Sequence, residues 1–207
     1  MDDKSNKRYF VHPTAIVEED VSIGEGTRIW HFVHVRTSTR IGRNCNIGKG
    51  VYIDEGVVIG NNVKIQNFVS VYRGVTIEDD VFIGPHATFT NDKYPRSFSR
   101  DWKVVPTIVK REASIGTNAT IVCGVTIGEY TMVATGAVVT KDVPSQGLVM
   151  GNPARLKGFV CYCVRPLRNN NIVGKTSQFV VYKCPGCSRE VCIPIEHYEM
   201  YLREVEK

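Results

Sequence analysis

Large apolar residues recur at every sixth position over the first half of the chain. They begin at Val11 and continue for fourteen successive repeats to Phe89. The last position of each hexapeptide is Ala, Val, Thr or Cys, from Ala15 to Ala87. A helix repeats about every 3.6 residues and a strand about every 2, so neither element alone produces this period. The pattern stops after Phe89 and resumes with Val109, Ile115, Ile121, Ile127, Val133 and Val139.

The six-residue period predicts short strands joined by turns. β-Branched residues favour strands, and the Gly, Asn and Asp residues between them favour turns. Three hexapeptides complete one coil of a prism, and successive coils pair as parallel strands about 4.8 Å apart. The expected fold class is therefore all-β, a parallel β-helix of hexapeptide repeats. A loop excursion near 90–108 interrupts it.

Residues that are three hexapeptides apart form columns along this prism. One wall carries His31 and His34, then Lys49 and Tyr52, then Asn67 and Ser70. This mixture of polar, basic and aromatic side chains indicates a ligand groove, and an exposed polar wall is the alternative. The excursion begins on the same wall, in the coil that follows Asn67 and Ser70. Six basic residues and two acidic residues lie in 91–111, which accounts for most of the net charge of +5.

Composition narrows the classes of protein that the sequence allows. Hydrophobic residues make up 43% and charged residues 23%, which is ordinary for a folded domain. No run of eighteen apolar residues predicts a membrane span. The first ten residues lack the apolar core of a secretory signal, so we expect a cytoplasmic protein. A charge of +5 is too small to indicate nucleic-acid binding, and it suits anionic small molecules where it is concentrated.

The last quarter of the chain is rich in cysteine. It contains Cys161, Cys163, Cys184, Cys187 and Cys192. Clustered cysteines in a cytoplasmic chain indicate metal ligands. The first four, two close pairs about twenty residues apart, resemble a zinc ribbon that holds one structural zinc ion. Free cysteines or a Cys187–Cys192 disulfide are the alternatives.

The hexapeptide period is lost from residue 159 onward. We therefore expect a β-helix domain over 1–158 and a cysteine-rich, zinc-ribbon-like segment over 159–207. This segment ends in a short helix that begins near residue 194. The helix places Ile195, Tyr198, Leu202 and Val205 on one face.

Four stretches within residues 10–160 resemble a known enzyme family. They are IGEGTRIWHFVHV, NVKIQNFVSVYRGVTIEDDVFIGPHATFTNDKYPRS, TIVCGVTIGEYTMV and LVMGNPARLKGF. They are similar to acetyltransferases that N-acetylate 3-amino nucleotide sugars. The resemblance implies a left-handed β-helix, acetyl-CoA as co-substrate, a nucleotide-linked amino sugar as acceptor, and a homotrimer with the groove between subunits. A non-catalytic β-solenoid scaffold or metal-binding subunit is the alternative from a different class.

Two subgroups of that family match these stretches. One acts on UDP-2-acetamido-3-amino-2,3-dideoxyglucuronate and the other on dTDP-3-amino-3,6-dideoxyhexoses. The NDKYPR form, with Asp92 and Tyr94, favours the dTDP subgroup slightly.

The resemblance implies catalytic roles at the start of the excursion. Asn91 is expected beside the reacting amine, with its side-chain carbonyl accepting a hydrogen bond, and a turn-capping Asn is the alternative. His86 is the histidine nearest Asn91 in sequence and is the candidate general base. The reaction can also proceed without a dedicated base, if the thiolate leaving group takes the proton. The predicted nucleotide-sugar contacts are His31, His34, Arg36, Tyr52, Gln66, Asn67, Tyr72 and Arg96.

The acetyl-CoA half of the predicted site begins at Val109. Ala134 and Gly136 are small enough for a pantetheine chain to approach the backbone. Asn152, Arg155 and Lys157 lie in or next to the GNPAR motif, where the two basic residues supply charge for the CoA phosphates. The alternative for GNPAR is a turn that ends the β-helix.

Overall fold

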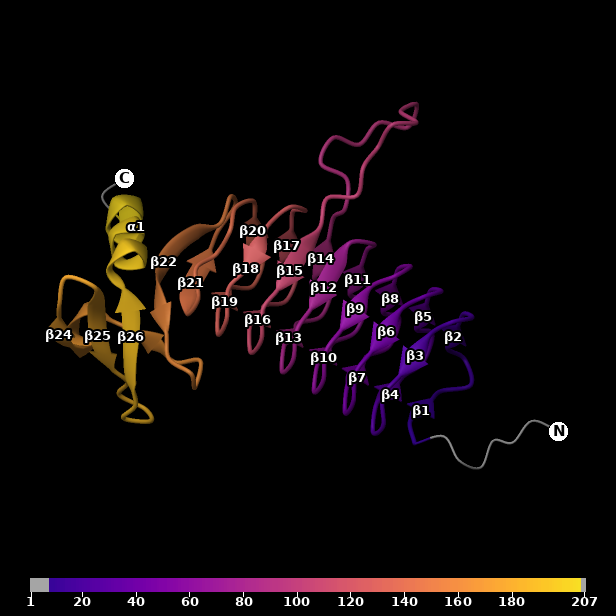
Figure 1. Cartoon of the computed structure of the whole chain (residues 1–207), viewed down its shortest axis with the longest axis horizontal. Helices are drawn as coiled ribbons and strands as arrows, with labels where there is room; N and C mark the ends of the chain where they lie inside the picture. The colour runs from indigo at the N-terminus through magenta and orange to yellow at the C-terminus, as the bar shows by residue number, and fades with distance from the viewer. Residues whose placement is uncertain (1–7, 206–207) are drawn as a thin grey trace.

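The computed structural model describes residues 8–205 and is a parallel β-helix with a C-terminal appendage (Figure 1). The predicted all-β fold is confirmed, because two-residue strands follow one another around three faces, sheets A, B and C. Sheet A contains β1 (Phe10–Val11), β4 (Arg28–Ile29), β7 (Asn46–Ile47), β10 (Lys64–Ile65), β13 (Phe82–Ile83), β16 (Ser114–Ile115), β19 (Met132–Val133), β21 (Gly147–Met150), β22 (Arg155–Val160) and β23 (Pro166–Leu167).

Sheets B and C complete the prism. Sheet B contains β2 (Ile16–Val17), β5 (His34–Val35), β8 (Tyr52–Ile53), β11 (Ser70–Val71), β14 (Thr88–Phe89), β17 (Thr120–Ile121) and β20 (Val138–Val139). Sheet C contains β3 (Ser22–Ile23), β6 (Arg40–Ile41), β9 (Val58–Ile59), β12 (Val75–Ile77), β15 (Thr107–Val109) and β18 (Thr126–Ile127).

The strand register agrees with the predicted columns. His34 is opposite Tyr52, and Tyr52 is opposite Ser70, each pair eighteen residues apart. Thr88 is opposite Thr120, because the excursion between β14 and β15 adds residues without changing the register. The apolar residue of each strand points inward, and Ile29, Ile47, Ile65, Ile83 and Ile115 are fully buried in one column.

Two corners of the prism are named by the sheets that they join. The turns that lead from sheet A to sheet B form the A/B edge, and those that lead from sheet B to sheet C form the B/C edge. The excursion leaves the B/C edge directly after β14 and projects away from the prism (Figure 1). Among residues 8–205, no helix has the length and hydrophobicity that crossing a membrane requires.

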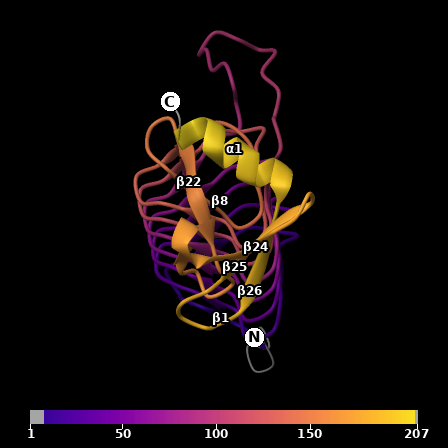
Figure 2. The ribbon, with the colours of Figure 1, turned by 90° about the vertical axis from the view of Figure 1, so that its left-hand side faces the viewer.

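The appendage covers the C-terminal end of the β-helix (Figure 2). Its sheet D contains β24 (Ile172–Lys175), β25 (Phe179–Lys183) and β26 (Glu190–Pro194), with a 3-10 turn (Asn169–Asn171) before it and α1 (Ile195–Val205) after it. β22 pairs antiparallel with β21 and contacts α1, so the predicted division between residues 158 and 159 falls inside a strand that both parts share.

The predicted apolar face of the C-terminal helix is confirmed except at its end. Tyr198 is buried, and Ile195 and Leu202 pack against the core. Val205 is 55% exposed, so the prediction is wrong for this residue. It is the last residue of α1.

Candidate functional site

A network of charged and aromatic side chains lies on sheet B and the adjoining B/C edge of the N-terminal coils. His34 Nε2 is 2.8 Å from Glu18 Oε1, and Arg36 Nε donates to the same oxygen at 3.3 Å. In the next coil, Asp54 Oδ1 accepts from Arg36 Nη1 at 3.4 Å and from the Tyr52 hydroxyl at 3.1 Å. Three of the predicted sugar contacts are therefore brought together and fixed by two carboxylates.

The network changes the acid–base behaviour of its members. The backbone N–H of Thr37 and the side chain of His34 both donate to the Glu18 carboxylate and lower its pKa. Partial burial raises the pKa of Tyr52, and its bond to Asp54 acts in the same direction. At neutral pH the edge therefore presents an ionised Glu18 and a protonated Tyr52 beside the Arg36 guanidinium.

This arrangement predicts a pH dependence of stability. A carboxyl whose pKa is lower in the folded state stabilises the fold above its ordinary value of about 4.3, and the stabilisation is lost as pH falls through the lowered value. Unfolding midpoints of wild type and Glu18→Gln, measured by circular dichroism between pH 3 and 7, should differ at the upper end and converge at the lower end. A difference of constant size across this range would contradict the assignment.

The root of the excursion continues the same edge. The rings of Tyr52 and Tyr72 are 5.7 Å apart, and the next position in the column is Thr90, directly before Asn91. The Asn91 backbone carbonyl accepts from Val105 N–H at 3.1 Å, which closes the neck of the excursion. A hollow of about 420 Å³ lies just outside this neck and is lined by Asn91, Asp92, Pro95, Arg96, Ser97 and Trp102.

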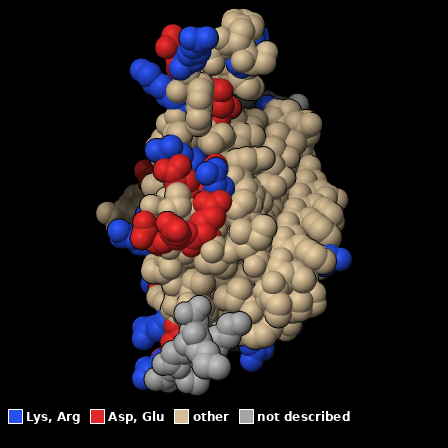
Figure 3. Space-filling view, turned by 90° about the vertical axis from the view of Figure 1, so that its right-hand side faces the viewer, with Lys and Arg blue, Asp and Glu red and all other residues tan. Residues whose placement is uncertain are grey.

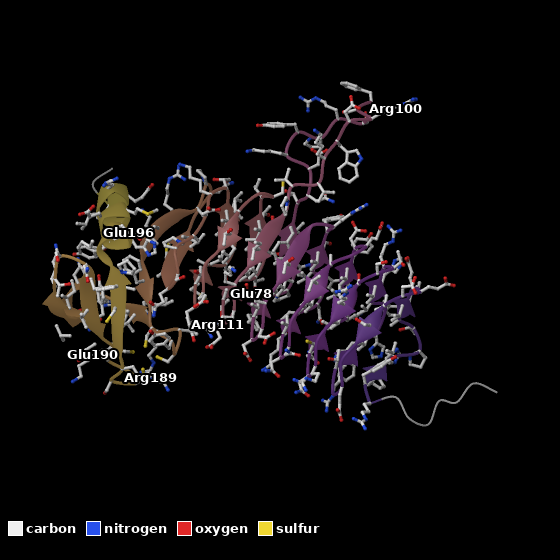
Figure 4. The ribbon with its side chains drawn as sticks, in the orientation of Figure 1. Glu78, Arg100, Arg111, Arg189, Glu190 and Glu196 are labelled. Carbon is white, nitrogen blue, oxygen red and sulfur yellow. The ribbon has the colours of Figure 1, made fainter. Side chains whose placement is uncertain are left out.

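The basic side chains of the excursion differ in position. Arg96 lines the hollow, and its Nη1 donates to the neighbouring Pro95 carbonyl at 2.9 Å. Arg100 lies at the outer end of the excursion, far from the prism (Figure 4). At the N-terminal end of the β-helix, acidic groups flanked by basic ones gather on one side below the excursion, and the opposite side carries little charge (Figure 3).

The A/B edge carries the other predicted sugar contacts. His31 stacks on His12 with ring centroids 3.5 Å apart, and His86 stacks on Phe68 at 5.3 Å. The Asn67 side-chain carbonyl accepts from the backbone N–H of Lys49 at 2.9 Å, which gives Asn67 a structural contact between coils. Gln66 is the residue before it in the same turn.

The two predicted catalytic residues lie on opposite edges of sheet B. His86 belongs to the turn before β14 and Asn91 follows the end of that strand. The strand β14 separates them, and His86 has the left-handed φ of 60° of a corner turn. In one copy of the chain, His86 and Asn91 therefore start from different corners of the prism. His86 and Asn91 are close in sequence, but the strand between them crosses a whole face of the prism.

The predicted acetyl-CoA residues lie at the C-terminal coils. Ala134 and Gly136 are in an A/B turn, and the backbone of Gly136 has a left-handed φ of 70° with open space where a Cβ would lie. Asn152 is exposed in the segment after β21. This segment runs beside β20, since Val138 N–H donates to Gly151 O at 3.0 Å and Ala154 N–H donates to Val138 O at 2.8 Å.

The two basic residues of this region have different surroundings. Arg155 Nε is 3.4 Å from Glu204 Oε2 of α1, so the appendage holds this guanidinium at the end of the β-helix. Lys157 is exposed on β22. Sequence reasoning missed Glu204, because nothing in the period of the β-helix places the C-terminal helix.

The sequence also contained little indication of a role for three other residues near the site. Glu18 and Asp54 share the column of Arg36, so the repeat gave their position but not their role. Trp102 lines the hollow outside the neck from a segment with no period, and only its place in a long basic excursion marked it.

The four predicted metal ligands converge. The Sγ atoms of Cys161, Cys163, Cys184 and Cys187 all lie within 4.8 Å of one another. The alternative of a Cys187–Cys192 disulfide is wrong, since both residues are free cysteines and Cys187 faces Cys161 at 3.5 Å.

Comparison with known proteins places this architecture among acyltransferases. The family of the bacterial transferase hexapeptide (six repeats) matches residues 20–55, 38–73 and 56–91, and the hexapeptide repeat of succinyl-transferase matches 106–141. A dTDP-3-amino-3,6-dideoxy-alpha-D-galactopyranose 3-N-acetyltransferase from Aneurinibacillus thermoaerophilus is 51% identical over 170 residues, which cover 79% of this chain and 85% of that protein.

Two solved structures are similar. One is a hexapeptide-repeat acetyltransferase from Vibrio cholerae O1 biovar eltor with acetyl coenzyme A (TM-score 0.52, 27% identity, 64% of this chain and 72% of that one). The other is a mutant GDP-perosamine N-acetyltransferase from Caulobacter crescentus with CoA and GDP-perosamine (TM-score 0.50, 25% identity, 72% of this chain). The chain spans only 55% of that second protein. Because the hexapeptide family models match the repeats and a relative is 51% identical over 79% of this chain, the chain belongs to the hexapeptide-repeat nucleotide-sugar N-acetyltransferases.

Proposed function

We propose that this enzyme transfers an acetyl group from acetyl-CoA to the 3-amino group of a dTDP-linked 3-amino-3,6-dideoxyhexose. The observation that carries the proposal is the 51% identity to an enzyme named for that acceptor, over a match that covers 79% of this chain. The polar B/C edge and the basic excursion beside it supply a surface suited to an anionic sugar nucleotide. A reducing cytoplasm is the compartment we propose, because all seven cysteines are free.

The proposed reaction needs a neutral amine next to the thioester. The amine nitrogen attacks the thioester carbonyl, the new C–N bond forms, the C–S bond breaks, and CoA leaves as a thiolate that takes up the amine proton. Holding both substrates in one groove supplies much of the rate enhancement. We assign to Asn91 the task of orienting the amine through its side-chain carbonyl, and to Arg96 a contact with the diphosphate.

We assign the remaining contacts by their place on the prism. His34, Arg36, Tyr52 and Tyr72 would hold the nucleotide and sugar on the B/C edge, while His31, Gln66 and Asn67 would approach from the A/B edge. Ala134, Gly136 and Asn152 would line the CoA chain, with Arg155 and Lys157 near its phosphates. His86 would serve as a base only in an assembly that brings it to another copy's Asn91.

The division of these residues between two edges supports a homotrimer. Phe32 and Phe68 lie two coils apart on the A/B edge and are exposed at 62% and 46%. Large apolar side chains exposed on the same edge indicate a contact surface. Cyclic symmetry would place the A/B edge of one copy against the B/C edge of the next and form three equivalent sites.

Sedimentation velocity tests this assembly. We expect a single species of three times the chain mass, and acetyl-transfer activity that is lost when the trimer dissociates on dilution. A stable monomer with full activity would contradict the proposed intersubunit site.

The acceptor is tested by the release of free CoA thiol. The assay compares dTDP-3-amino-3,6-dideoxygalactose, its glucose epimer, a UDP-linked 3-amino uronate and GDP-perosamine at equal concentration. We expect the highest kcat/KM with a dTDP acceptor. Faster turnover of the UDP uronate would overturn the dTDP assignment, and release with none of the panel would overturn the proposed activity.

A further inference from the structure

Four cysteine thiols form a compact cluster at the junction of the β-helix and the appendage. Cys161 Sγ is 3.5 Å from Cys187 Sγ, and Cys163 Sγ is 3.6 Å from Cys184 Sγ. All four sulfurs lie within 4.8 Å of one another. With Zn–S bonds of about 2.3 Å, the sulfurs of a tetrahedral site are about 3.8 Å apart. The cluster therefore has the size of a four-thiolate metal site.

The backbone around the cluster also suits a metal site. Cys161 and Cys163 lie between β22 and β23, while Cys184 and Cys187 lie between β25 and β26. The residue after the second cysteine of each pair has a left-handed backbone, with φ of 67° at Val164 and 58° at Ser188. In the second turn, Gly186 N–H points at Cys184 Sγ at 3.4 Å. The sulfurs of both turns thus converge, and the Gly186 N–H would stabilise Cys184 as a thiolate.

Arg165 lies against the same turn. A Cβ built on Gly186 would overlap the Arg165 guanidinium, so the side chain covers the CPGC turn closely. Four thiolates around one divalent ion carry a net charge of −2, and a neighbouring cation offsets part of it. Gly186 leaves room for this contact, which a side chain at that position would block.

We propose that Cys161, Cys163, Cys184 and Cys187 bind one Zn²⁺ that fastens the appendage to the β-helix. One ligand pair follows β22, which is a strand of sheet A, and the other pair lies on the β25–β26 hairpin of sheet D. Phe159 of β22 meets Tyr182 of β25 at 6.3 Å and Tyr201 of α1 at 5.9 Å, so the metal would lie at one end of an apolar contact between the two parts. All four protein ligands would be thiolates, and such a closed site is structural.

The metal content of the full chain, purified without chelator, tests the proposal. Elemental analysis should find one zinc ion per chain. Cobalt-exchanged protein should show the thiolate charge-transfer and tetrahedral ligand-field absorption bands of a four-sulfur site. Cobalt bands of an octahedral oxygen site would contradict the assignment, and so would one iron ion per chain in place of zinc.

Cysteine variants locate the ion. Cys184→Ser should lower zinc affinity at least about tenfold, in a competition with a chromophoric chelator. Cys192→Ser is the matched control, because Cys192 is an exposed cysteine of the same appendage outside the cluster, and it should retain one zinc ion. Thiol titration of the wild type in denaturant gives an answer even if Cys184→Ser fails to fold. Seven thiols with the release of one zinc ion per chain support the site, whereas seven thiols without zinc, or three thiols and two disulfides, would overturn it.

Discussion

Replacing Asn91 by alanine is expected to lower kcat about 100-fold while the KM for acetyl-CoA changes less than about twofold. The neck bond between the Asn91 carbonyl and Val105 N–H involves only backbone atoms, so the substitution leaves the excursion closed. What it removes is a side-chain group at the proposed position of the amine. Misplacing a reacting group by about 1 Å can cost about 10²-fold in rate, and loss of the contact that orients the amine is an effect of this kind.

Steady-state kinetics with both substrates varied separates the two parameters. Arg100→Ala is the matched control, because Arg100 belongs to the same excursion but lies at its outer end (Figure 4). Its kcat should stay close to that of the wild type. An Asn91→Ala enzyme with kcat within twofold of wild type would remove Asn91 from the reacting centre.

A second large effect is expected when residues 93–103 are replaced by a single glycine. The deletion removes Arg96 and Trp102 from the hollow, together with all four basic residues of the excursion. Turnover should fall by more than about 10³-fold, because the sugar nucleotide would lose the groups that orient it. The β-helix should persist, since β15 pairs with β12 in unbroken register on the far side of the excursion.

Circular dichroism and sedimentation show whether the shortened chain is folded and assembled like the wild type, so that their turnover can be compared. The shortened chain should keep the far-ultraviolet spectrum and the unfolding midpoint of the wild type, because closing a shorter loop changes its entropy cost only slightly. Retained turnover in a shortened chain that is folded and trimeric would show that the excursion lies outside the site.

The β-helix could be predicted in detail because its determinants are local and periodic. One inward β-branched residue every six positions defines each strand, and the eighteen-residue column defines its neighbours, as at Ile65 and Ile83. The eighteen-residue column also predicted that His34 lies beside Tyr52. Repeats bury their core against adjacent coils only, so a single sequence contains nearly all the information.

The site could be predicted less completely, because distance along the chain is not distance across the prism. His86 and Asn91 are five residues apart and lie on opposite edges of sheet B. The partner of Arg155 is Glu204, which no repeat relates to it. The cysteine pairs were visible in the sequence, but only the folded hairpins show that all four sulfurs reach one point.

The proposed enzyme moves the acetyl group from the thioester to a sugar nitrogen. The most direct test follows both products in one reaction of the enzyme with acetyl-CoA and dTDP-3-amino-3,6-dideoxygalactose. Thiol titration measures released CoA, and mass spectrometry with NMR measures the sugar nucleotide. We expect equal amounts of CoA and of a product acetylated on the C3 nitrogen. Release of CoA without an acetylated sugar, or an acetyl group on a hydroxyl oxygen, would contradict the proposed reaction.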